Sequence, residues 1–212
     1  MPTRGEVAAS YDAIAAEFDA SRDRPWPETV AFARELPPTS RVLDLGCGGG
    51  RNLRFLKEGG HRVVGLDASA GLLARATAKV GRRSLIRGDI VSLPFRSAAF
   101  DAAHCVAALH HLPSGAERRQ SVREIARVLR PGAVALLSVW AREQDRFRSM
   151  KDEDTFVPWR RSDGTAIARF YHPFRAGELE ALVSAANLSA VRAWREGDNH
   201  VVLARPPKRK GT

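Results

Sequence analysis

The sequence predicts an α/β protein built on a mostly parallel sheet, and three observations support this prediction. Short apolar runs alternate with segments of helical periodicity between residues 41 and 139. The first run, 41–45, ends in a glycine-rich turn at residues 46–50 that leads directly into a helix-like segment. A second run ends in Asp67, about twenty residues further on. Strands that alternate with helices form a sheet covered on both faces, and ligands bind beyond the carboxyl ends of its strands.

Composition limits the class of protein. The chain has 212 residues, 44% of them hydrophobic, which suits one domain with a full core. Two cysteines, Cys47 and Cys105, are too few for a disulfide framework or a zinc site, so we expect a cytoplasmic protein without a metal. We expect no membrane association, because no apolar run approaches ~20 residues and residues 1–10 lack the apolar core of a signal peptide.

The net charge of +10 favours a polyanionic partner, because clustered arginine and lysine release counterions from phosphates. Basic residues gather at residues 22–24, at 142–175 and in the tail at 205–210. An arginine-rich proteome is the alternative explanation. We expect residues 206–212 to form a flexible basic tail that contacts phosphates without specificity.

The first 38 residues predict an amino-terminal cap of two helices. Apolar side chains at helical spacing predict the first helix over residues 5–20. Pro27 suits the first turn of a second helix, which ends at Leu36 before two prolines. The intervening loop, 21–27, is rich in proline and charge, and we expect it to cover the ligand pocket.

The middle of the chain continues the alternation of strands and helices. Ser69 is a suitable amino-terminal cap for a helix over 72–80, and residues 130–132 are expected to close a helix over 116–129. The remaining expected elements are a helix over 52–58 and strands over 62–66, 83–87, 99–105 and 133–139.

The alternation breaks after residue 139. Residues 140–172 show no clear period and predict a structureless insertion on the substrate side, of the kind that is usually functional. A helix over 177–186 follows, and strands over 188–195 and 200–205 predict an antiparallel hairpin. The expected fold is therefore a single domain over residues 1–205, with a seven-stranded mostly parallel sheet, helices on both faces and this carboxyl-terminal hairpin.

The spacing Asp44-x-Gly46-x-Gly48 differs from the dinucleotide-binding and phosphate-loop patterns. It resembles motif I of the class I S-adenosylmethionine-dependent methyltransferases, which have a Rossmann-like fold. More narrowly, several phrases resemble the tRNA wobble-uridine carboxymethyl methyltransferases. These phrases are Arg24-Pro-Trp-Pro27, Ala108-Leu-His-His111, Phe156-Val-Pro-Trp159, Arg169-Phe-Tyr-His172 and Asp198-Asn199.

The resemblance implies methyl transfer from S-adenosylmethionine to the carboxylate of 5-carboxymethyluridine at the wobble position of tRNA, giving the methyl ester. It also implies a small zinc-binding activator subunit as a possible partner, at the exposed edge strand 83–87. We assign Asp67 to the cofactor's ribose. The other expected cofactor-binding residues are Tyr11, Arg24, Asp44, Gly46 and Gly48 at the methionine end, Asp89 and Ile90 at the adenine, and Ala68 and Ala107 beside them.

A carboxylate acceptor is ionised at pH 7 and needs orientation rather than a strong base. For this acceptor we expect aromatic stacking and a cation, and the catalytic candidates are His111, Trp140, Arg142, Arg169 and His172, with Trp159 and Tyr171 as further aromatic candidates. A metal site at His110 and His111 is disfavoured, because neighbouring side chains at a strand end point apart. Structural alternatives remain open: Asp44 and Asp89 as caps, Tyr11 as core, and the aromatic residues as lid packing.

Two other functions remain open at this point. A small-molecule methyltransferase acting on a quinone precursor or a carboxylic acid would share everything up to residue 139. An RNA-binding protein that keeps the fold without turnover is a different class of alternative. Cofactor binding and methyl incorporation separate the second from an enzyme, and the choice of acceptor separates the two enzymes.

Overall fold

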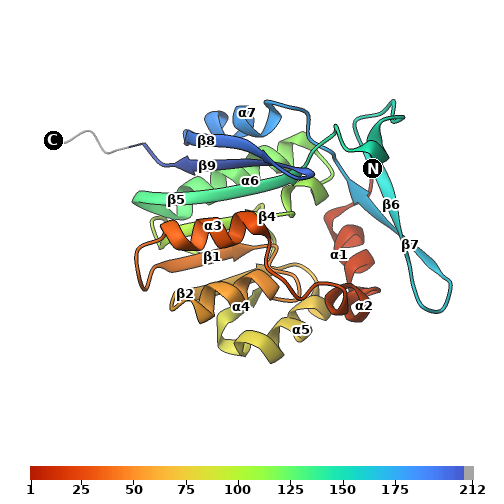
Figure 1. Cartoon of the computed structure of the whole chain (residues 1–212), viewed down its shortest axis with the longest axis horizontal. Helices are drawn as coiled ribbons and strands as arrows, with labels where there is room; N and C mark the ends of the chain where they lie inside the picture. Colours follow the sequence, from red (N-terminus) through yellow and green to blue (C-terminus); the bar gives the residue numbers. More distant parts are fainter. Residues whose placement is uncertain (208–212) are drawn as a thin grey trace.

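A computed structural model describes residues 1–207; most of the expected basic tail, 208–212, lies outside the described residues. A seven-stranded sheet in the order β3-β2-β1-β4-β5-β9-β8 forms the centre of the molecule (Figure 1). The strands span Arg41–Leu45 (β1), Arg62–Asp67 (β2), Leu85–Arg87 (β3), Phe100–Val106 (β4), Leu129–Trp140 (β5), Ser189–Glu196 (β8) and Asn199–Arg205 (β9). Strands β1 to β5 run parallel, and β9 is antiparallel to both β5 and β8. The predicted Rossmann-like sheet and its carboxyl-terminal hairpin are confirmed.

The strand order creates a switch point between β1 and β4. From β1 the chain first builds outward through β2 to β3, then returns to place β4 on the other side of β1. Val42, Leu43 and Leu45 of β1 are buried, as expected for a central parallel strand covered on both faces. In open α/β sheets the ligand crevice lies at such a switch point, beyond the carboxyl ends of the strands.

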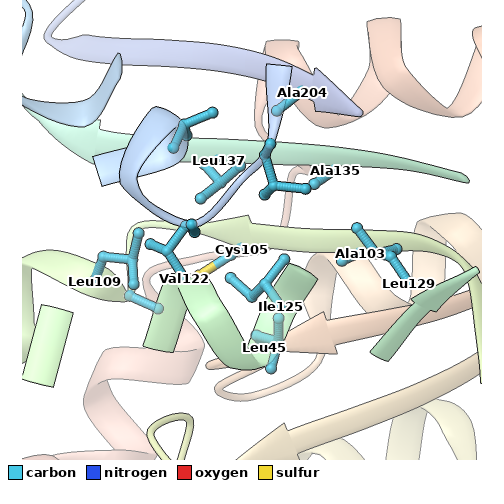
Figure 2. Close-up of a cluster of buried hydrophobic side chains, with 14 of the residues drawn as sticks. Leu45, Ala103, Cys105, Leu109, Val122, Ile125, Leu129, Ala135, Leu137 and Ala204 are labelled. Atoms are coloured by element: carbon cyan, nitrogen blue, oxygen red, sulfur yellow. The ribbon is translucent and has the colours of Figure 1, made fainter. Parts of the chain in front are cut away.

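Helices cover both faces of the sheet. One apolar cluster joins the sheet to α3 (Pro27–Glu35), α4 (Arg51–Glu58) and α5 (Ala70–Val80). A second cluster lies on the opposite face, under α6 (Gly115–Val128) and α7 (Glu178–Ala185). Figure 2 shows part of the second cluster, in which Val122 and Ile125 of α6 lie among side chains of the central strands.

Three local predictions need correction. The helix expected over 5–20 is divided into α1 (Arg4–Asp12) and α2 (Ala15–Ala20). The break is stabilised because the Asp12 carboxylate accepts hydrogen bonds from the Ser69 hydroxyl and the Gly71 amide, which ties the end of α1 to the start of α5. The strand expected over 83–87 is shorter, because residues 82–84 form a 3₁₀ turn. After α6 the chain enters β5 directly, so residues 130–132 lie within an irregular strand start instead of a closing turn.

The structureless insertion predicted over 140–172 is wrong for its second half. Strands β6 (Thr155–Arg160) and β7 (Ala166–Tyr171) form a separate antiparallel hairpin, preceded by the 3₁₀ turn η3 (Asp145–Phe147). The hairpin extends away from the main sheet beside α1 and α2 (Figure 1). Its β7 strand contacts α1, so the hairpin stands at the same end of the molecule as the amino-terminal helices. Over residues 1–207, the longest and most apolar helices still fall short of what a bilayer crossing requires.

Candidate active site

A first cavity lies where the glycine turn meets the ends of β2 and β3. It is lined by eight of the ten residues that we assigned to the cofactor from the sequence: Tyr11, Gly46, Gly48, Asp67, Ala68, Asp89, Ile90 and Ala107. Gly46 has φ +69°, and an added Cβ would lie 2.5 Å from the Ala108 Cβ, so only glycine fits this turn. Ala107 also has a positive φ, +57°, which is costly for a residue with a Cβ and is typical of functional sites.

Asp67 at the end of β2 provides the carboxylate of the first cavity. One oxygen accepts a hydrogen bond from the Gly48 amide at 2.8 Å, and the other accepts one from the Ser69 amide at 2.9 Å. Burial raises the pKa of Asp67 to about 6, although both backbone amides act in the opposite direction. The side chain is therefore mostly ionised at pH 7 and can accept hydrogen bonds from ligand hydroxyls.

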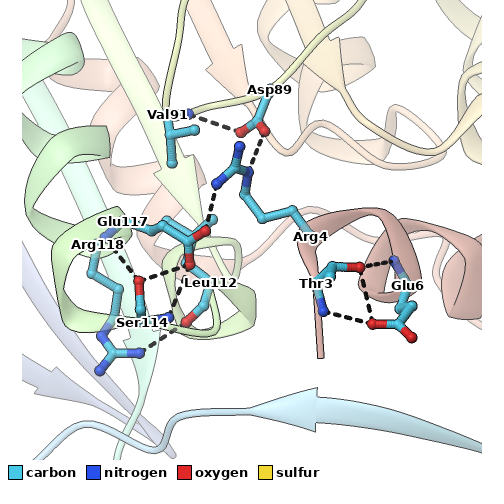
Figure 3. A network of polar contacts seen from close by, with 9 residues as sticks. All are labelled: Thr3, Arg4, Glu6, Asp89, Val91, Leu112, Ser114, Glu117 and Arg118. Carbon is cyan, nitrogen blue, oxygen red and sulfur yellow. Dashed lines mark hydrogen bonds and ion pairs between the residues drawn. The ribbon is translucent and has the colours of Figure 1, made fainter. Parts of the chain in front are cut away.

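Arg4 lies at the rim of the first cavity, a position that was not predicted from the sequence. Its Nε donates to Asp89 Oδ2 at 2.5 Å, and its Nη1 donates to Glu117 Oε1 (Figure 3). Thr3 and Glu6 form a capping box at the start of α1, and Ser114 and Glu117 form another at the start of α6. Arg4 thus joins two helix starts to the loop after β3, although each of these contacts is partly exposed to solvent.

Asp44 and Arg24 do not line the first cavity. Asp44 is 2% exposed, and its Oδ1 lies 2.7 Å from Nδ1 of His104 on the neighbouring strand β4. The opposite ring nitrogen of His104 lies 2.9 Å from the Thr29 hydroxyl. This buried chain joins β1, β4 and α3 beneath the glycine turn. Arg24 is exposed, and its loop instead presents Arg22 to the site.

A second cavity adjoins the first and shares six residues with it, among them Gly46 and Gly48 of the turn. Aromatic side chains enclose it: Tyr11, Phe18, Trp26, Trp140 and Tyr171. The Tyr11 hydroxyl lies 2.9 Å from His111 Nε2 and 3.2 Å from the Tyr171 hydroxyl, to which Arg169 donates at 2.8 Å. Tyr11 is therefore both buried and part of the cavity wall, which unites the two alternatives left open by the sequence.

Trp140 lines the second cavity, but its ring already has partners on both sides. Tyr171 stacks on it at 4.4 Å with an interplanar angle of 15°, and the Arg146 guanidinium carbon lies 4.8 Å from its centroid. Both partners reduce the part of this ring that an acceptor base could contact.

The second cavity contains cations but no effective base. Arg22 and Arg51 line it, and neither forms an ion pair within residues 1–207. Burial lowers the pKa of Arg51 to about 10, with a further contribution from Arg22, so the side chain stays charged at pH 7. Burial also lowers the pKa of His111 to about 4, and that of His110 well below the usual value, so both rings are neutral. Asp19, the carboxylate in the wall, is paired with Lys79.

Arg142 and His172 line neither of these cavities. Arg142 donates to the backbone carbonyls of Met150 and Asp152, at 2.5 and 2.6 Å. His172 lies between Asp154 and Glu178, with 2.7 Å from each ring nitrogen to a carboxylate oxygen. Successive side chains at a strand end point to opposite sides, so Tyr171 faces the second cavity while His172 faces away. Both residues instead line a third cavity, described below.

The expected geometry of the histidine pair is also wrong. His110 and His111 belong to the 3₁₀ turn η2 (Leu109–His111), and their ring centroids lie 4.3 Å apart instead of pointing away from each other. His110 Nδ1 accepts a hydrogen bond from the Trp140 amide, and His111 Nδ1 faces the Phe170 carbonyl. Over the described part of the chain no three metal-binding side chains come together.

Sequence reasoning did not identify Arg4, Phe18 and Arg51 as residues of the two cavities, whereas Arg22 and Trp26 lie in the loop 21–27 that was expected to cover the pocket. Two signals were available. Phe18 follows Tyr11 by seven residues, which is two helical turns, and Arg51 directly follows the last glycine of the turn. The pairing of Arg4 with Asp89, 85 residues away, leaves no local signal.

Comparisons with known proteins agree with this geometry. A methyltransferase domain family matches residues 43–137. A tRNA (carboxymethyluridine(34)-5-O)-methyltransferase of Schizosaccharomyces pombe is 33% identical over 92% of this chain and 93% of its own length. A protein of the same name from Arabidopsis thaliana is 39% identical over 64% of this chain, and the match spans only 32% of that longer relative.

Solved structures share the fold at low sequence identity. A Burkholderia thailandensis 1,6-didemethyltoxoflavin-N1-methyltransferase with bound S-adenosylhomocysteine has a TM-score of 0.73 and 22% identity, over 96% of this chain and 88% of that one. A putative methyltransferase in complex with the Haloferax volcanii Trm112 methyltransferase activator has a TM-score of 0.74 and 19% identity, over 97% of this chain and 100% of that one.

The sheet order and the paired cavities at its switch point define a class I methyltransferase whose cofactor is S-adenosylmethionine. The residues present fit this cofactor: a glycine turn that a Cβ would obstruct, a carboxylate for hydroxyls, and apolar walls at Leu72 and Ile90. Within that class, the near full-length match to the fission yeast enzyme shows that the chain belongs to the tRNA carboxymethyluridine(34) methyltransferase family.

Proposed function

We propose that this protein transfers a methyl group to the carboxylate of 5-carboxymethyluridine at the wobble position of tRNA, forming the methyl ester. The observation that carries the proposal is the second cavity, which holds unpaired Arg22 and Arg51 beside neutral His111. Such a cavity suits an acceptor that is an anion before the reaction. It does not suit a hydroxyl acceptor, which needs a base to remove a proton.

We propose that S-adenosylmethionine binds in the first cavity, with each of its three parts against a different wall. We assign the ribose hydroxyls to Asp67, and the adenine to Asp89 and Ile90. Gly46, Gly48 and Tyr11 are assigned to the methionine end, because they also border the second cavity. Ala68 and Ala107 complete the wall. Asp44 does not line the cavity; it lies buried beneath the turn, where it contacts His104.

The bound cofactor supplies a methyl group on a positively charged sulfur. Transfer of that methyl group to an ionised carboxylate would require no proton to be moved by the residues of this chain. The protein's contribution is to hold the carboxylate through Arg22 and Arg51 and to exclude water with the aromatic wall. Arg169 acts indirectly, because it donates to the Tyr171 hydroxyl that contacts Tyr11.

The partners of the protein follow from the same proposal. tRNA is the acceptor, in keeping with the net charge of +10 and with the family. An activator subunit of the Trm112 type is proposed at β3, which is the edge strand next to β2 and has half-buried Leu85 and Ile86. Edge strands with unpaired backbone groups favour such pairing. The expected cytoplasmic location stays a prediction.

The test is methylation of tRNA from cells that lack this enzyme, with labelled S-adenosylmethionine and nucleoside analysis. We expect a carboxymethyluridine methyl ester at the wobble position. Arg22→Ala should lower kcat/KM about 10- to 100-fold, because a charged hydrogen bond contributes ~1.5–3 kcal/mol. Arg24→Ala is the matched control in the same loop, and it should stay within about twofold of the wild type because its side chain is exposed outside both cavities.

Cofactor binding by calorimetry separates the outcomes. Both arginine variants should bind S-adenosylmethionine as the wild type does. Equal losses of activity in Arg22→Ala and Arg24→Ala would contradict the assignment of the second cavity. Cofactor binding without methylation of any tRNA, with or without a candidate activator subunit, would refute the proposed acceptor and favour a small-molecule substrate.

A further inference from the structure

A third cavity, of about 720 Å³, lies between α6, α7 and the segment after β5. Four arginines line it: Arg118, Arg119, Arg142 and Arg175. None of their guanidinium groups lies within 4 Å of a carboxylate in the described part of the chain, as those of Arg4, Arg127 and Arg130 do. Four unpaired guanidinium groups in one cavity form an anion site that the methyl-transfer chemistry does not use.

Arg118 is the strongest indication that this cavity takes a ligand. It is only 7% exposed, and its Nη1 donates to the Leu112 carbonyl at 2.8 Å (Figure 3). Burial lowers its pKa, although the charges of Asp154, Glu178 and Glu153 act in the opposite direction, and no carboxylate of residues 1–207 lies within 4 Å of its guanidinium group. A buried cation without a contacting counter-charge is costly, so an anion that enters the cavity gains from contact with it.

The acidic residues of the cavity do not cancel this charge. Two glutamates, Glu153 and Glu178, line it beside the four arginines. Glu178 is already engaged, because its Oε1 lies 2.7 Å from His172 and its Oε2 accepts from the Arg175 amide. The four arginines still outnumber the two glutamates of the cavity, which favours an anion with several acceptor oxygens, such as a phosphate.

The third cavity is close to the second. The His172 amide donates to the His110 carbonyl at 2.8 Å, and His110 lines the second cavity while His172 lines the third. Only the junction between η2 and β7 therefore separates the two. A nucleic acid strand that places one nucleotide in the second cavity passes within reach of the third.

We propose that the third cavity binds a backbone phosphate of the RNA substrate, on a nucleotide near the one that is methylated. This inference rests on the proposed function. It also gives the sequence-predicted residues Arg142 and His172 a different place: they shape a phosphate site next to the acceptor, and they do not contact the acceptor itself. Arg142, held by the carbonyls of Met150 and Asp152, orders the segment that walls the cavity.

The test compares Arg119→Ala and Arg175→Ala with Arg123→Ala. Arg123 is an exposed arginine one turn from Arg119 on α6, it does not line the cavity, and its removal changes the net charge equally. We expect each cavity variant to raise the KM for tRNA roughly tenfold and to lower the slope of log KM against log salt by about one. The kcat and the affinity for S-adenosylmethionine should match the wild type. Arg123→Ala should change neither the KM nor the slope.

Several results would overturn the inference. One is a KM and salt slope in Arg119→Ala and Arg175→Ala that equal those of Arg123→Ala. Another is a combination of two results: inorganic phosphate raises the thermal midpoint of the wild type but not of the cavity variants, and the KM of these variants for tRNA is unchanged. That combination would show that the cavity binds free phosphate and not the RNA. If the wild type methylates no tRNA, the proposed function fails by itself, and direct binding of labelled tRNA to the same variants still tests the cavity.

Discussion

Removal of the His104 imidazole should destabilise the protein severely. His104 is fully buried in β4, and it lies between the Asp44 carboxylate at 2.7 Å and the Thr29 hydroxyl at 2.9 Å. The second oxygen of Asp44 is buried and has no hydrogen-bond partner, so His104→Ala would leave the whole carboxylate unpaired. Breaking a buried pair in this way costs about 3–5 kcal/mol, a large part of the ~5–15 kcal/mol that stabilises a typical domain.

The assay is urea unfolding followed by circular dichroism, with His61→Ala as the matched control. His61 is also buried, at 8% exposure, but no carboxylate contacts it and its Nδ1 has no partner. The control should therefore lose only packing, about 1–2 kcal/mol. Thr29→Val, which removes one neutral hydrogen bond, should cost about 1 kcal/mol. A loss in His104→Ala no larger than that in His61→Ala would refute the view that Asp44 depends on this partner.

Three further predictions concern the first cavity. Gly46→Ala should abolish S-adenosylmethionine binding in calorimetry, because its Cβ would lie 2.5 Å from that of Ala108 at a positive φ. Cofactor affinity should fall about tenfold between pH 7 and pH 5, because Asp67, with a pKa of about 6, becomes protonated. The same raised pKa means that the folded protein without cofactor binds this proton more tightly than the unfolded chain does, so the contribution of Asp67 to folding stability should increase as the pH falls. Cofactor affinity and folding stability, each measured against pH, should therefore show opposite trends. Asp67→Ala should lose the affinity at every pH. Arg4→Ala should cost less than 1 kcal/mol in thermal unfolding, because its ion pairs are partly exposed, yet should speed cofactor release in stopped-flow measurements.

The main sheet could be predicted because each strand carries its own signal. The run 133–139 is apolar except at Ser138, and Asp67 and Asp89 stand at the ends of the second and third runs. The β6–β7 hairpin was missed although residues 155–160 alternate between half-buried and exposed. The exposed positions hold Phe156, Pro158 and Arg160, so the sequence itself does not alternate between apolar and polar residues, and a partner of Trp159, Glu17, lies more than a hundred residues away.

More of the residues assigned to the cofactor than of those assigned to the acceptor line the cavities at the switch point, for a related physical reason. The former follow the ends of parallel strands, which the fold brings to one edge of the sheet whatever the side chains are. The latter lie on segments whose orientation depends on contacts across the chain. Tyr171 and His172 are neighbours in the sequence, but one faces the second cavity and the other the third.

The net charge alone does not indicate what the protein binds; the ion-pair partners of each basic residue must also be known. The sequence shows 34 basic residues against 24 acidic ones, which an arginine-rich composition explains as well as RNA binding does. The structure adds the location of these charges. Arg127 and Arg130 are paired with carboxylates, and Arg62, Arg83 and Arg96 are unpaired within residues 1–207 on the exposed surface. Six further arginines without an ion pair among the described residues line the second and third cavities, two in the second and four in the third, and Arg118 among them is buried. A substrate that carries a carboxylate next to a phosphate backbone would compensate the charge in both cavities.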